Sequence, residues 1–224
     1  LDSPSFSHLM EHGVAVDGHP PLVQIFLYYY VPICGGSVFL IKLPFVLISV
    51  LAVHQMYWLT KQWFGKSAAY WAAGAMAVLP FFMYYGQVAR PYGPGLNGTL
   101  WMAQMWFFLS KKEEVKRGHW VQWVLAAWIC AYSHYFAALQ AAFLWLSAGF
   151  WWPAQRRLAW GLSGVVMLAG FAPYLPYFLH QLSMGGIGGP DGWLGTPEPR
   201  FVWDFLSYLF AFNPWLWCSA GFLA

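Results

Sequence analysis

Residues 67–110 read SAAYWAAGAMAVLPFFMYYGQVARPYGPGLNGTLWMAQMWFFLS and contain one charged side chain, that of Arg90. A membrane-crossing helix needs about 20 mostly apolar residues, so this run is long enough for two. Pro91 follows the arginine and predicts the break between them. An ionised guanidinium at the edge of a hydrocarbon layer is costly without a partner. Arg90 is therefore a candidate binder of an anion such as phosphate or carboxylate.

The same apolar character extends over the whole chain. It is 60% hydrophobic, 21% aromatic and 8% charged, whereas soluble domains carry about 25% charged residues. A water-exposed surface of this composition would aggregate, so the sequence predicts an all-α, polytopic transmembrane helix bundle. The net charge of +3 is too small and too scattered to indicate a nucleic-acid partner. The three cysteines are far apart and lack the spacing of disulfides or metal ligands.

The order of apolar and polar segments predicts the positions of the helices. Candidate spans lie at about 38–60, 67–86, 92–110, 119–135, 136–152 and 158–179, with a last one starting near 205. Residues 22–33 are too short to cross and contain Tyr28-Tyr29-Tyr30, which predicts a helix in the membrane interface. We expect residues 1–224 to form one membrane-embedded domain, an internal fragment that lacks a first helix and a C-terminal part.

Basic residues divide unequally between the two sets of loops. One set holds Lys61, Lys66, Lys111, Lys112, Lys116, Arg117, Arg156 and Arg157, and the other holds Lys42, Arg90 and Arg200. Cytoplasmic loops carry the excess of Lys and Arg, so the first set is predicted to face the cytoplasm. Most acids and histidines then lie on the opposite side. We therefore expect the functional surface on the non-cytoplasmic face of the cell membrane, which is the inner membrane if the source is Gram-negative.

Several polar residues on that face are candidates for chemistry. Asp2, in the first loop, could act as a general base, although an isolated loop aspartate is usually only solvated. Asp17-Gly18-His19-Pro20-Pro21 is equally consistent with a plain helix start. His134 lies where two predicted spans meet and could bond either a ligand or the backbone. Trp193 is the tryptophan of the outer loop.

A possible metal motif is weak. His8-Leu9-Met10-Glu11-His12 fits a His-x-x-Glu-His zinc pattern. Gly13 follows at once, little helix holds the pair, and no third ligand is specified. We therefore predict no metal ligands, leave a divalent metal open, and expect no nucleotide cofactor.

The order of these motifs resembles a known family. An Asp in the first outer loop is followed by His19-Pro20-Pro21-Leu22, by Gln87–Tyr92 at an outer helix end, by Tyr132–Phe136 and by Gly192-Trp193. This order is similar to that of the GT-C-type membrane glycosyltransferases of the protein-mannosyltransferase and family 39 group. The group includes dolichyl-phosphate-mannose-protein mannosyltransferases and aminoarabinose transferases.

The resemblance implies a function and roles for the candidates. It implies a GT-C-like bundle that moves a sugar from a polyprenyl-phosphate donor to a lipid, glycan or protein acceptor at the outer face. Asp2 matches the acidic residue of the first loop, which by the resemblance is the catalytic base or positions the acceptor, although Ser3 stands where the family usually has Glu. Arg90, accompanied by Tyr92, matches the arginine near the donor phosphate. The other substrate-binding candidates are Asp17, His19, His134 and Trp193.

Two alternatives from other classes are left open. One is a flippase or transporter of lipid-linked sugars in which Arg90 binds an anionic substrate along a pathway. The other is a non-catalytic membrane subunit. A transporter would place charges deep in several spans or show paired half-helices, whereas here the charges cluster at outer helix ends. The enzyme is therefore the favoured interpretation.

Overall fold

Helices make up the regular structure of the described part of the chain. The computed structural model describes residues 3–111, 114–184 and 198–213, and the predicted all-α class is confirmed there. The helices are α1 Phe6–His8, α2 Leu22–Ile33, α3 Val38–Phe64, α4 Lys66–Val78, α5 Pro80–Gly86, α6 Tyr92–Lys111, α7 Arg117–Ser133, α8 Tyr135–Trp151, α9 Arg157–Phe171, α10 Leu175–Ser183 and α11 Phe201–Leu209. Shorter turns complete them: a π-helical turn Leu9–Val14 and 3-10 turns Ala154–Arg156 and Ala172–Tyr174.

Two helical segments of the described residues are long and apolar enough to cross a membrane. They are Val38–Phe64 and the continuous run Ala154–Ser183, and α4 with α5 forms a third if this bent pair is one span. The ends of helices α6, α7 and α8 lie within two residues of the ends of the predicted spans. These helices are either too short or not apolar enough to count among the candidate membrane spans. Helix α2 has 12 residues, too few to cross. Its place in a membrane interface stays a prediction.

The predicted span 67–86 is wrong as one straight helix. Helices α4 and α5 meet at an angle of 62°. Leu79 between them has an extended backbone, with φ −64° and ψ 123°, and Pro80 begins α5. A proline drives the preceding residue out of the helical region and cannot donate to the turn before it. The break therefore follows from Pro80, inside an otherwise continuous apolar run.

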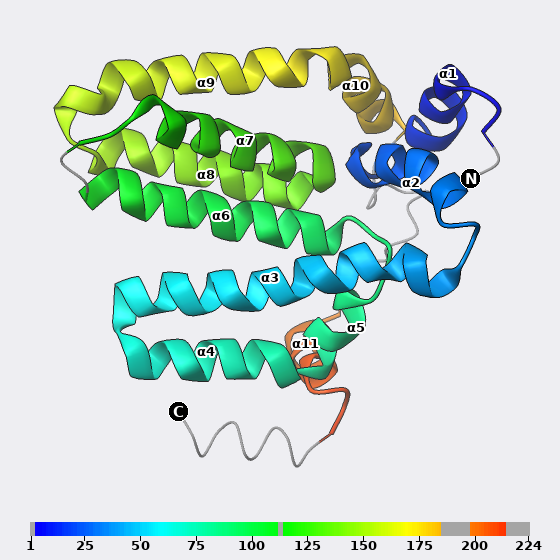
Figure 1. Ribbon diagram of the computed structural model, residues 1–224, viewed down its shortest axis with the longest axis horizontal. Coiled ribbons are helices and arrows are strands. Elements are labelled where there is room, and N and C mark those ends of the chain that lie inside the picture. Colours follow the sequence, from blue (N-terminus) through cyan, green and yellow to red (C-terminus); the bar gives the residue numbers. More distant parts are fainter. Residues whose placement is uncertain (1–2, 112–113, 185–197, 214–224) are drawn as a thin grey trace.

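The helices lie side by side, so their ends form two polar surfaces (Figure 1). At the left of the view α3 passes into α4, α6 ends, α7 begins and α8 passes into α9; we call this the basic end. Its helix termini carry Lys61, Lys66, Lys111, Lys116, Arg117, Arg156 and Arg157. At the right lie α1, α2, the start of α6, the α7–α8 junction and α10; we call this the site end. The division of basic residues seen in the sequence is thus a division between the two ends of the bundle.

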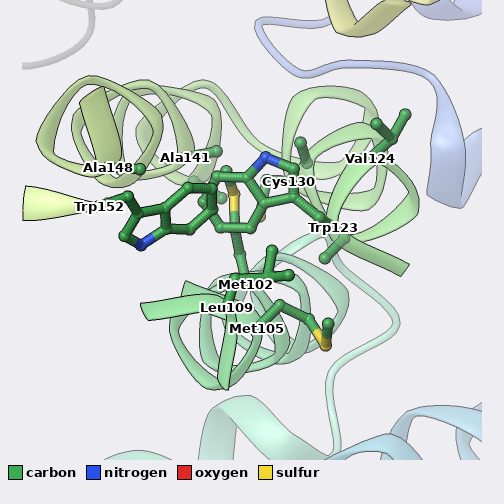
Figure 2. Packing of buried hydrophobic residues seen from close by; sticks show 12 residues of the cluster. Met102, Met105, Leu109, Trp123, Val124, Cys130, Ala141, Ala148 and Trp152 are labelled. Atoms are coloured by element: carbon green, nitrogen blue, oxygen red, sulfur yellow. The ribbon is translucent and has the colours of Figure 1, made fainter. Parts of the chain in front are cut away.

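The core lies between α6, α7, α8 and the start of α9. Trp123 of α7 is fully buried at its centre, and its ring centroid lies 5.1 Å from that of Trp152 (Figure 2). Its indole N–H donates to the Ser163 hydroxyl over 3.3 Å. The surrounding side chains are Met102, Met105 and Leu109 from α6, Cys130 from α7, and Ala141 and Ala148 from α8. Small residues such as these alanines let membrane helices approach closely.

Gly98 sets the distance between α6 and α7. A Cβ atom at this position would lie 2.9 Å from Cys130 Sγ and 3.1 Å from the backbone nitrogen of Cys130. Cβ atoms essentially never approach other atoms within 3.0 Å, and the 3.1 Å approach would require the α7 backbone to shift by a few tenths of an ångström. The missing side chain of Gly98 is therefore a condition for the α6–α7 contact. This contact matters for the site because α6 begins, and α7 ends, at the site end.

We predict that Gly98→Ala destabilises the bundle. Overpacking of this kind costs about 1–3 kcal/mol, and the backbone of α7 cannot yield without displacing the α7–α8 junction. Thermal unfolding of the purified protein in detergent measures the loss. Gly74→Ala in the middle of α4 is the matched control, because a Cβ there meets no atom within 4 Å. Equal stability of the two variants would contradict the role assigned to Gly98.

Candidate functional site at the end of the bundle

Three segments distant in the sequence meet at the site end. The loop between the π-helical turn and α2 carries Asp17 and His19, the α5–α6 connection carries Arg90 with Tyr92 at the start of α6, and the α7–α8 junction carries His134. The rings of His19, Tyr92 and His134 form one aromatic cluster. The structure therefore brings together five of the predicted site residues. Asp2 and Trp193 lie outside the described residues.

Asp17 and His19 form a hydrogen-bonded pair. His19 Nδ1 lies 3.0 Å from Asp17 Oδ1, and the Gln24 amide donates to Asp17 Oδ2 over 2.6 Å. The side chains are partly covered, with 33% of Asp17 and 19% of His19 exposed. If Nδ1 is the donor to Asp17, His19 Nε2 is the ring atom that remains for a ligand. Gln24 thus belongs to the site, although the sequence offered no signal for it.

Pro20 and Pro21 fix the loop behind this pair. Both prolines are fully buried, and Pro21 is the N-cap of α2. The His-Pro-Pro sequence is therefore a helix start, as its simpler interpretation held. It also fixes His19 one residue before a rigid, buried anchor. The two interpretations are compatible.

His134 and Tyr92 complete the aromatic cluster. The ring centroid of His134 lies 5.3 Å from that of His19 and 5.6 Å from that of Tyr92. His134 is the N-cap of α8, where its Nδ1 accepts the N–H of Phe136 over 3.2 Å. Burial and the nearby positive charge of His19 lower the pKa of His134 below its ordinary value. At neutral pH its imidazole is therefore neutral, with Nδ1 occupied by the backbone.

The carboxyl group of Asp17 is held in its ionised form. The hydrogen bond from His19 lowers the pKa of Asp17 most, the charges of His19 and Arg90 and the Gln24 amide lower it further, and burial opposes them. Arg90 itself is exposed. Among the described residues the ion pairs within 4.0 Å are Asp17–His19 and Arg200–Asp204, so the Arg90 guanidinium pairs with no acid there. The site end therefore presents a cation beside, but not bound to, an ionised Asp–His pair.

Tyrosines from three helices border the cluster. The Tyr92 ring, 39% exposed, contacts Tyr85 of α5 edge-to-face at 4.9 Å. The Tyr85 hydroxyl lies 3.1 Å from that of Tyr208 in α11. These rings offer faces and hydroxyl groups, the combination with which proteins contact partly polar ligands such as sugars.

The bend between α4 and α5 leaves a groove beside the cluster. It has a volume of about 440 Å³. Val50 and Met83 on its walls are both more than half exposed, so it opens at the outside of the bundle. The lining residues are Val46, Ser49, Val50, Val53, Met76, Ala77, Phe82, Met83, Gly86 and Gln87. Gln87, one of the lining residues, stands three residues before Arg90 in the chain.

The possible metal motif of the first loop shows no third ligand among the described residues. The rings of His8 and His12 stack with centroids 4.4 Å apart, and Glu11 bonds Ser7. The described residues contain no group of three His, Cys, Asp or Glu side chains that could hold a metal ion.

Sequence reasoning also missed Gln181 of α10, whose amide contacts the backbone of the first loop. A lone buried amide in an apolar helix gave no signal of this role.

The comparisons place this geometry in a family. The family model described as dolichyl-phosphate-mannose-protein mannosyltransferase matches residues 18–177, which include His19, Arg90, Tyr92 and His134. The comparison with curated proteins and that with solved structures gave no match. The matched segment covers more than half of the 224 residues and confirms the resemblance noted in the sequence. The chain belongs to the dolichyl-phosphate-mannose-protein mannosyltransferase family and is a glycosyltransferase of the membrane.

Proposed function

We propose that this glycosyltransferase takes its sugar from a polyprenyl-phosphate donor and transfers it to an acceptor on the non-cytoplasmic side of the membrane. The observation that carries the proposal is the cluster at the site end, where the Arg90 cation lies beside the Asp17–His19 pair. An exposed guanidinium without an acidic partner fits a phosphate, which it can bind with two parallel hydrogen bonds. His19 Nε2 and the Tyr92 ring would then contact the same phosphate and the attached sugar.

The apolar groove beside Arg90 supports a lipid-linked donor. A nucleotide sugar would leave a groove of about 440 Å³ lined by valine, methionine and phenylalanine unused. An isoprenoid chain partitions into such a groove by the hydrophobic effect, at about 25 cal/mol per Å² of apolar surface removed from water. Gln87 lines the groove and stands three residues before Arg90, so a phosphate attached to a chain in the groove would lie near this cation. The groove and the cation together suit one amphipathic molecule.

The reaction is a displacement at the first carbon of the sugar. We assign Asp2 as the base that takes the proton from the acceptor's hydroxyl or amine. The acceptor's oxygen or nitrogen then bonds to the sugar carbon, and the bond from that carbon to the phosphate oxygen breaks. The electron pair leaves with the polyprenyl phosphate. Arg90 stabilises the negative charge that develops on this leaving group, an effect that grows in a water-poor cleft.

The sidedness of the site rests on the positive-inside rule. The basic end carries the excess of Lys and Arg and would face the cytoplasm. The site end would then open on the opposite side. A transporter remains the second candidate, because Arg90 and the groove could equally bind a lipid phosphate without reacting. The match to a family of mannosyltransferases supports the enzyme over the transporter.

We predict that Arg90→Ala lowers kcat/KM for the donor by about 10²–10³-fold, the usual cost of removing one electrostatic contact to a developing oxyanion. Arg90→Lys recovers part of the loss, because it keeps the charge without the planar fork. Asp2→Asn lowers kcat by about 10²–10⁴-fold. The measurement is transfer from radiolabelled polyprenyl-phosphate sugars by the full-length protein in vesicles.

The control for these variants is Arg200→Ala. Arg200 is a 73% exposed cation whose partner is Asp204, and its removal should leave transfer unchanged. Full activity of both Asp2→Asn and Arg90→Ala would contradict the site. Movement of labelled lipid between leaflets without any transfer would favour the transporter and contradict the enzyme.

We predict a second effect, on stability against pH. The folded pKa of Asp17 lies below its ordinary value of 3.8, so its ionisation stabilises the fold above that value. This stability is lost as the pH falls through the lowered pKa. The midpoint of thermal unfolding should therefore be higher in wild type than in Asp17→Asn at neutral pH. The difference should shrink below about pH 4.

Two comparisons isolate this effect. Protonation of His134 below about pH 6.5 opposes folding in both proteins and cancels in their difference. Asp204→Asn removes an exposed carboxylate of the pair with Arg200 and should change stability little at any pH. A difference between wild type and Asp17→Asn that stays constant down to pH 2 would contradict the ionised pair.

A further inference from the structure

Gln181 of α10 joins the first loop to the far end of the chain. Its side chain is buried, with 5% of the residue exposed. The amide nitrogen donates to the carbonyl oxygens of Val14, at 2.6 Å, and Asp17, and a third contact of 3.4 Å reaches that of His19. One amide group thus contacts the backbone at both residues of the Asp17–His19 pair and at the turn before them.

Two tyrosine hydroxyls hold the other side of this amide. Tyr174 donates to Gln181 Oε1 over 3.0 Å, and Tyr135 donates to the same oxygen. The two hydroxyls lie 3.0 Å apart. Tyr135 is the first residue of α8 and follows His134 directly. The amide plane of Gln181 is therefore fixed from both ends, by backbone carbonyls on one side and hydroxyls on the other.

The backbone of the loop makes few hydrogen bonds of its own, although the buried Pro20 and Pro21 anchor its end and the Tyr174 hydroxyl also contacts the His19 carbonyl. In the segment between the π-helical turn and α2, the Asp17 N–H donates a backbone hydrogen bond to the Val14 carbonyl over 3.2 Å. Carbonyl groups buried without a donor cost about 1–3 kcal/mol each, so the Gln181 amide favours this one arrangement of the loop. A shift of the loop would move His19 relative to His134, which Tyr135 ties to the same network.

We propose that Gln181, with Tyr135 and Tyr174, is a positioning residue for the reaction. It touches no reacting atom. It sets the place of the Asp17–His19 pair against Arg90 and His134 by donating to the carbonyls of Val14 and Asp17 and contacting that of His19. The inference rests on the proposed function of that pair in donor binding. Gln181 lies beyond the matched residues 18–177, so the family match does not assign it a role.

The first test measures the loop without reference to activity. Hydrogen–deuterium exchange of the full-length protein is followed for the backbone amides of residues 14–19. Gln181→Ala should raise their exchange at least tenfold, because the loop carbonyls lose their donor and the loop opens more often. The control is Gln140→Ala. Gln140 is an exposed amide on α8 that accepts one bond from Thr99, and its loss should leave this segment unchanged.

The second test measures transfer from polyprenyl-phosphate mannose. Gln181→Ala should lower kcat/KM for this donor about 10–100-fold, the range found when the groups that orient a site are removed. Most of the change should appear in KM, because the chemistry of Asp2 is untouched. Gln181→Glu keeps the acceptor oxygens but loses the donor to the carbonyls, so it should not rescue transfer.

Tyr135→Phe provides a milder variant and a double-mutant cycle. It removes one of the two hydroxyls on Gln181 Oε1 and should lower kcat/KM severalfold in the wild-type background. In the Gln181→Ala background the same change should have almost no effect, since Tyr135 would act through the missing amide. Additive losses would mean that Tyr135 acts on the substrate directly and would overturn the network.

The remaining outcomes are equally decisive. Unchanged exchange of residues 14–19 in Gln181→Ala would overturn the holding of the loop. Faster exchange with unchanged kcat/KM would overturn the positioning role, because the loop's place would not matter to the reaction. If the wild-type protein transfers no sugar, the proposed function fails instead, and the exchange measurement alone decides whether Gln181 holds the loop.

Discussion

The cost of placing charge in hydrocarbon governs the arrangement of this molecule. Long stretches of α3, α6, α7, α8 and α9 carry no ionised side chain, whereas their termini carry most of the basic residues. Because the helices lie side by side, charges excluded from their middles collect at two surfaces (Figure 1). One surface carries the excess of Lys and Arg. The other holds Arg90, an ionised aspartate and a cluster of histidine and tyrosine rings, and so becomes the place where polar chemistry can occur.

The packing of the helices converts this general constraint into a defined site. Close contact at Gly98 and a core centred on Trp123 fix α6 against α7 and α8. Arg90 and Tyr92 are therefore carried on the connection into α6, and His134 on the junction that ends α7, at a set separation. Proline acts twice in this region. Pro80 bends α5 away from α4 and opens the groove, and Pro91 separates Arg90 from the body of α6.

Much of this could be predicted from the sequence, for a clear reason. The length of an apolar segment and the charges at its ends can be read from neighbouring residues, so the sequence predicts the ends of α6, α7 and α8 to within two residues. Because successive helices run in opposite directions, it also predicts that Arg90, Tyr92, His19 and His134 lie on one side. The break at Pro80 could not be predicted. Pro44 lies inside α3 without ending it, and the sequence does not distinguish the two cases. Gln24 and Gln181 were missed because a neutral amide, bonded to distant groups, leaves no pattern along the chain.

The bond between Gln181 and the first loop also has a consequence for biosynthesis. The amide and the Val14 carbonyl are 167 residues apart in the chain. A growing polypeptide folds from its N-terminus as it is made, so the loop emerges long before the helix that holds it. An unfinished chain that already contained Arg90 and His134 would still lack a fixed Asp17–His19 pair. Termination before α10 would therefore yield a chain whose first loop lacks this contact.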